Sequence, residues 1–114
     1  MGDGELRSAA QKMLPRIESS QKLISAGSKK ITTSEMLTIP SEQGKVSFEV
    51  ACAGNGSFDI MRTTRKPHSG DIPTVECDGK SQGFIFQGGD LEELTLQAYG
   101  ETSGIAAWRF TKER

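Results

Sequence analysis

Histidine and cysteine are scarce in this chain. Its 114 residues include a single histidine, His68, and two cysteines, Cys52 and Cys77. A catalytic site with a nucleophile and a base would have to use His68 together with Ser69 or Asp71. No Gly-x-Ser-x-Gly motif supports such a site. The paired histidines of metal-dependent hydrolases are also missing. We therefore expect neither catalytic residues nor a metal site.

Long apolar runs and a strong net charge are absent as well. No run approaches the roughly 20 apolar residues of a membrane-spanning helix, and no signal-peptide core precedes the first expected strand. The net charge is only −1, which argues against a nucleic-acid partner. No phosphate-binding glycine motif is present, so we expect no cofactor. A hydrophobic fraction of 34% is lean, and a covalent cross-link would help such a domain.

Alternating strands and glycine-rich turns are what the chain does contain. Residues 45–52 place Val46, Phe48, Val50 and Cys52 on one face, which is the period of a half-buried strand. Residues 57–63 resume the alternation after the glycine-rich residues 53–56, which predicts a hairpin. Five more strands are expected, at residues 34–39, 74–77, 83–87, 92–99 and 105–110. About seven evenly spaced strands predict an all-β, antiparallel sandwich.

The sandwich could be immunoglobulin-like or a jelly roll. The immunoglobulin pattern places a tryptophan between two widely spaced cysteines, whereas Trp108 follows both cysteines here. Cys52 and Cys77 would enter the same core, and a bridge closing about 26 residues would contribute roughly 3–3.5 kcal/mol. The alternative is a pair of reduced, buried thiols in a cytosolic protein.

Residues 1–30 differ in character from the rest. They carry six basic and three acidic side chains, a net charge of +3. An amphipathic stripe, interrupted by Pro15, precedes a linker-like stretch at residues 25–30; the stripe consists of Leu6, Ala10, Met13, Leu14 and Ile17. We predict a partly helical tether over 1–30 and the sandwich domain over 31–114. The stripe could also pack on the sandwich or lie on an anionic membrane surface.

Three features together resemble a group of known proteins. They are the run VACAGNGSFDI, the run VECDG, and a closing strand with a single tryptophan. Over about residues 45–110 the chain is similar to small secreted proteins and lipoproteins of actinobacteria. The resemblance implies export, a Cys52–Cys77 bridge and an N-terminal lipid. Gly2-Asp3-Gly4 is similar to the residues that often come after a lipidated cysteine, but this chain has no such cysteine, so a membrane contact would require a lipid anchor that has been removed.

Binding residues are easier to propose than catalytic ones. Arg62, Arg65, Lys66 and His68 surround one long polar loop and could form a cationic patch for an acidic protein, a phosphate polymer or an acidic sugar. Tyr99, at a strand end, is expected to be exposed.

Trp108 could stack on a sugar, yet it shares a face with Ala106 and Phe110 and is predicted to lie in the core.

These features predict a non-enzymatic binding module, exported or tethered to the cell surface, that recognises a protein or a cell-envelope polymer. The alternative is a carbohydrate-binding module or a small inhibitor of an extracellular enzyme. Both predictions place the protein outside the cell or in the envelope.

Overall fold

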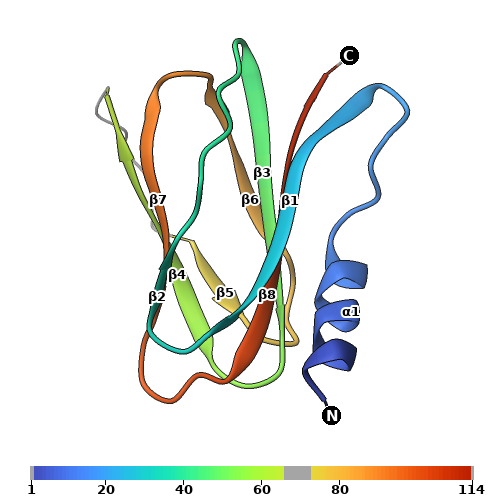
Figure 1. Ribbon diagram of the computed structural model, residues 1–114, viewed down its shortest axis with the longest axis vertical. Coiled ribbons are helices and arrows are strands. Elements are labelled where there is room, and N and C mark those ends of the chain that lie inside the picture. The colour runs from blue at the N-terminus through green and yellow to red at the C-terminus, as the bar shows by residue number, and fades with distance from the viewer. Residues whose placement is uncertain (1, 66–72, 114) are drawn as a thin grey trace.

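The fold is a sandwich of two antiparallel four-stranded sheets with one N-terminal helix, as Figure 1 shows. The computed structural model describes residues 2–65 and 73–113. One sheet has the order β1-β8-β3-β6 and the other has the order β2-β7-β4-β5. The elements are α1 (Asp3–Met13), β1 (Gln21–Ile31), β2 (Ser34–Met36), β3 (Lys45–Ala53), β4 (Ser57–Thr64), β5 (Thr74–Glu76), β6 (Gln82–Gln87), β7 (Leu91–Ala98) and β8 (Gly104–Glu113).

The strand order is that of a jelly roll, and it confirms the predicted all-β antiparallel sandwich. Apart from β4 and β5, which pair with each other, consecutive strands lie in opposite sheets. The predicted hairpin over residues 45–63 is therefore wrong. β3 pairs with β6 and β8, whereas β4 pairs with β5 and β7. Alternation reveals which side of a strand is buried, but strands that face each other across a core alternate in the same way as strands that pair.

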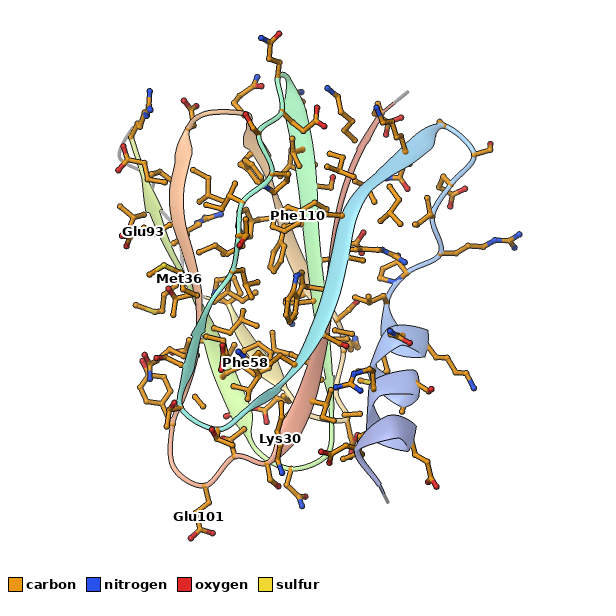
Figure 2. All side chains as sticks on the ribbon, viewed as in Figure 1. Lys30, Met36, Phe58, Glu93, Glu101 and Phe110 are labelled. Carbon is orange, nitrogen blue, oxygen red and sulfur yellow. A yellow bond between two sulfur atoms is a disulfide. The ribbon has the colours of Figure 1, made fainter. Side chains whose placement is uncertain are left out.

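Aromatic side chains fill the space between the sheets. Phe48 of β3 has its ring centroid 5.0 Å from that of Phe110 of β8 and 5.5 Å from that of Phe84 of β6. Phe58 of β4 enters from the opposite sheet and is fully buried; Figure 2 shows Phe58 and Phe110 between the two layers. Tilted ring pairs of this kind contribute beyond the area that they bury. The core is thus built from the inward positions of both sheets.

A disulfide links Cys52 of β3 to Cys77, which directly follows β5, and so joins the two sheets. The Asp78 N–H donates to the Cys52 carbonyl at 2.7 Å, and the Asp78 side chain accepts a hydrogen bond from the Gly54 N–H at 3.1 Å. Asp78 has a positive φ of 65°, a conformation that Asp tolerates better than most residues. The predicted bridge is confirmed, and it is compatible with an extracellular protein.

Gly104, the first residue of β8, lies directly against this bridge. A Cβ atom there would stand 2.5 Å from the sulfur atoms of both Cys52 and Cys77. Its φ is not positive, so the backbone itself would accept alanine. Glycine is therefore required here because a side chain would have no room, and not because of the backbone conformation.

The predicted linker at residues 25–30 is wrong, because these residues lie in β1. This strand pairs with β8 along Gln21–Ile31, so the sandwich begins before the predicted boundary at residue 31. Gly27 lies opposite Trp108, and a Cβ atom at Gly27 would approach the indole ring to 2.7 Å. A small residue leaves room for the indole, which is packed against the core. Because glycine stands at this position, β1 lacks the alternation of apolar and polar residues by which the other strands are predicted.

Helix α1 covers part of the sheet that contains β8 and β3. Ala10 is fully buried and packs with Ala53 of β3 and Ala107 of β8. The predicted stripe contributes Leu6, Met13 and Leu14 to the same cluster. The helix ends at Met13, and Leu14 is extended with φ −71° and ψ 143°, as expected for a residue that precedes proline. No described helix is long and apolar enough to cross a membrane.

The contacts of α1 show which of the two expectations for its apolar stripe is met, packing on the sandwich or contact with a membrane surface. Leu6, Ala10, Met13 and Leu14 of the stripe pack on the sandwich. The helical part of the stripe therefore faces the sheet and not a membrane surface in this arrangement.

Replacing Gly104 with alanine should destabilise the fold. The new methyl group has to displace the disulfide or the start of β8, and overpacking of this kind typically costs about 1–3 kcal/mol. Urea unfolding of the oxidised protein measures the loss. Gly4→Ala is the control, because a Cβ there meets nothing within 4 Å and alanine favours a helix. Equal stability of Gly104→Ala and the parent protein would contradict the packing described here.

Candidate functional site

Arg62 points into the sandwich and not into a surface patch. On β4 it follows Phe58 and Ile60 on the buried side of the strand and is itself half-buried. Its guanidinium carbon lies 4.4 Å from the ring centroid of Phe84, which belongs to β6 of the opposite sheet. A cation over an aromatic face is a stabilising contact. Arg62 of β4 thus packs on an aromatic side chain of β6, and this contact connects the two sheets.

Arg65 follows β4 and is exposed. Its side-chain Nε lies 3.4 Å from a carboxylate oxygen of Glu92. Its backbone N–H donates a hydrogen bond to the Asp90 carbonyl. Lys66 and His68 lie outside the described residues. The structure therefore does not bring Arg62 and Arg65 together, since one faces the core and the other pairs with an acid at the surface.

The two arginines should differ in their contribution to stability. Arg62→Ala removes both the cation–π contact and the packing of the aliphatic stem, an expected loss of about 2 kcal/mol. Arg65→Ala removes an exposed ion pair, which is worth about 0.5 kcal/mol. Chemical unfolding of the two variants side by side measures the difference. If Arg65→Ala is the more destabilising variant, the inward placement of Arg62 is wrong.

The two aromatic candidates also differ in exposure. Tyr99 is 57% exposed beyond the end of β7, as expected. Trp108 is half-buried and packs against the core, with Ala106 and Phe110 buried on the same face of β8. The prediction that Trp108 belongs to the core is confirmed. Trp108 also reaches the surface, however, because it lines a groove at the edge of the sandwich.

This edge groove lies between β1 and the residues around β2. It encloses about 380 Å³, and its lining comprises Ser25, Ala26, Lys29, Glu35, Met36, Leu37, Thr38, Pro40 and Trp108. The Lys29 ammonium lies 2.9 Å from a Glu35 carboxylate oxygen, so that an ion pair connects the two sheets across the groove. An indole next to paired charges and hydroxyl groups offers both stacking and hydrogen bonding.

Among the described residues, no helix covers the outer face of the sheet β2-β7-β4-β5, since α1 packs on the other sheet. Met36 of β2 and Met61 of β4 both lie in register with Thr95 of β7, so the three residues form one row across this face. Met36 is 67% exposed and Met61 is 37% exposed. Figure 2 shows Met36 and Glu93 on the side of the sandwich opposite α1. We call this surface the open face.

The open face is acidic. Asp59, Glu76 and Glu93 stand at outward positions, because the residues next to them, including Phe58, Val75 and Leu94, are buried. The Asp59 carboxylate accepts a hydrogen bond of 2.6 Å from the Thr74 hydroxyl. In these four strands, all of which are described, the only basic residue is Arg62, and it points inward. A sheet face that carries exposed methionines and acids together can bind a complementary surface.

The chemistry available to the described residues is that of binding. No group of three His, Cys, Asp or Glu side chains in residues 2–65 and 73–113 could hold a metal ion. Sequence reasoning did not select Met36 or Met61. The signal for Met61 was present, since it alternates with the inward Phe58 and Ile60 and must face outward. Met36 gave no such signal, because β2 is only three residues long.

Comparisons with protein-family models and with curated proteins find no match. The resemblance to actinobacterial secreted proteins therefore stays a prediction. Any functional conclusion has to come from the residues and their arrangement.

Proposed function

We propose that the protein is a non-enzymatic binding module, exported or tethered to the cell surface, that recognises a protein partner through the open face. The observation that carries the proposal is the row of Met36, Thr95 and Met61 on a sheet face that no described helix covers. Exposed apolar side chains that cluster on one face characterise interaction surfaces. Methionine suits such a surface because its side chain adapts to the partner.

Charge specifies the kind of partner. Asp59, Glu76 and Glu93 share the outer face with the two methionines, without a compensating cation in these strands. A partner with a basic rim around an apolar centre would match this pattern, and complementary charge would speed association. An extracellular enzyme with such a surface fits this description, so inhibition of that enzyme is a special case of the proposal. The disulfide between Cys52 and Cys77 supports an extracellular or envelope location.

A carbohydrate ligand in the edge groove is the second candidate. The observation that favours it is Trp108 beside the Lys29–Glu35 ion pair. The groove and the open face differ in the side chains that they present, although they share Met36. Variants of Met61 and Trp108 therefore distinguish the two candidates.

The open face can be tested by site-specific crosslinking. A photoreactive phenylalanine derivative at Met61 should crosslink one discrete partner from the envelope and secreted proteins of the producing cells. With that partner purified, Met61→Lys and Glu93→Lys should each weaken binding at least tenfold, about 1.4 kcal/mol. Each variant places a positive charge where a basic partner would contact the face. Titration calorimetry at two salt concentrations measures both the affinity and its electrostatic part.

Ile85→Lys is the matched control, because Ile85 is 65% exposed on β6 of the opposite sheet. It should change the affinity by less than twofold. Equal loss from Ile85→Lys and Met61→Lys would refute the open face as the binding surface. Binding to a glycan that survives Met61→Lys but is lost in Trp108→Phe would favour the groove and the carbohydrate alternative.

A further inference from the structure

A second cavity lies where the chain leaves α1 and passes over the outer face of β1 and β8. It encloses about 280 Å³, close to the lower limit of roughly 300 Å³ for small-molecule sites. Its lining comprises Gln11, Leu14, Ile17, Leu23, Ala26, Gly27, Ser28, Ala107, Trp108 and Arg109. The small residues of the two strands leave space beneath the segment after α1, so we call this space the arch cavity.

One wall of the arch cavity is apolar and partly open to solvent. Leu14 and Ile17 come from the segment after α1 and are half-buried, whereas Leu23 of β1 is 50% exposed. These side chains converge on the cavity from both sides of the turn that precedes β1. A short hydrocarbon chain would fill such a space and remove apolar surface from water.

The cavity is also lined by Arg109, which has one buried donor, Nε, without an acceptor among the described residues. Buried donors are almost always satisfied in folded proteins, so an unsatisfied one indicates a missing acceptor. Guanidinium groups bind carboxylates and related anions through paired hydrogen bonds.

The nearest acid in the sheet does not fill this role. Glu49 of β3 stands opposite Arg109 in the register, but no ion pair joins them in the described part of the chain. The Glu49 side chain instead turns toward β6, where a Cβ on Gly83 would lie 3.1 Å from its Cγ. Arg109 thus borders the arch cavity while Glu49 lines a different hollow beside β6. Arg7, which donates to the Ser28 hydroxyl at 2.8 Å, adds a second cation near the cavity.

We propose that the arch cavity binds a single-chain amphipathic anion, a short alkyl chain that ends in a carboxylate or a similar group. The head group would accept hydrogen bonds from Arg109, and the chain would lie against Leu14, Ile17 and Leu23. This site is independent of the open face, so either proposal can fail without the other. The small volume suits one free chain and not the surface of a bilayer.

Trp108, the single tryptophan of the chain, gives a readout, because it belongs to the cavity lining between Ala107 and Arg109 although its ring packs on the core side of β8. Titration with octanoate should change its fluorescence saturably. Octanamide, which has the same chain length without the charge, should bind at least tenfold more weakly. Arg109→Gln should reduce octanoate affinity at least tenfold, and circular dichroism verifies that the variant is folded.

Leu23→Asp tests the same site without touching the sheet interior, because Leu23 is half exposed. A carboxylate there should repel octanoate and lower its affinity at least tenfold. Ile85→Asp, the same kind of change on β6, should leave the affinity within twofold. The proposal is overturned if octanoate and octanamide bind alike, if Leu23→Asp binds as the parent does, or if only anionic phospholipid vesicles change the fluorescence.

Discussion

The Cys52–Cys77 bridge holds the two sheets together at one end of the sandwich, and the surrounding geometry depends on it. The chain must turn from β3 into β4, return to Cys77, and leave space for the start of β8 beside the sulfur atoms. Gly54 and Gly104 meet this demand, because a Cβ on Gly54 would contact the Cα of Gly104 at 2.9 Å. In a domain with few hydrophobic residues, this covalent link supplements a small core.

The two sheets differ in what covers their outer faces. On one sheet, Ala53 and Ala107 let α1 approach closely, and the segment after the helix forms the arch cavity. On the other sheet, Met36 and Met61 remain in contact with solvent among acidic side chains. The molecule therefore offers two surfaces of different chemistry, a concave site beside Arg109 and an acidic sheet face. The proposed functions rest on this asymmetry.

Periodicity predicted much of this fold and little of its connectivity. The alternation with polar residues predicts that Phe48 and Phe110 belong to the core, and the same pattern places Cys52 inward. β1 was missed because Gly27 replaces an apolar side chain under the Trp108 ring. Spacing in the sequence does not show whether the predicted cationic patch forms. Arg62 faces inward from β4, whereas Arg65 lies exposed beyond the end of that strand. The arch cavity depends on a segment without a regular period.

The contrast between the covered sheet and the open face can be measured by methionine oxidation. Met36 and Met61 lie on the open face, whereas Met13, at the end of α1, packs against the other sheet. Treatment of the folded protein with dilute hydrogen peroxide, followed by peptide mass spectrometry, should show Met36 oxidised fastest, Met61 next and Met13 slowest. Oxidation of Met13 as fast as Met36, in protein whose disulfide is intact, would contradict the account, because α1 would then not cover its sheet.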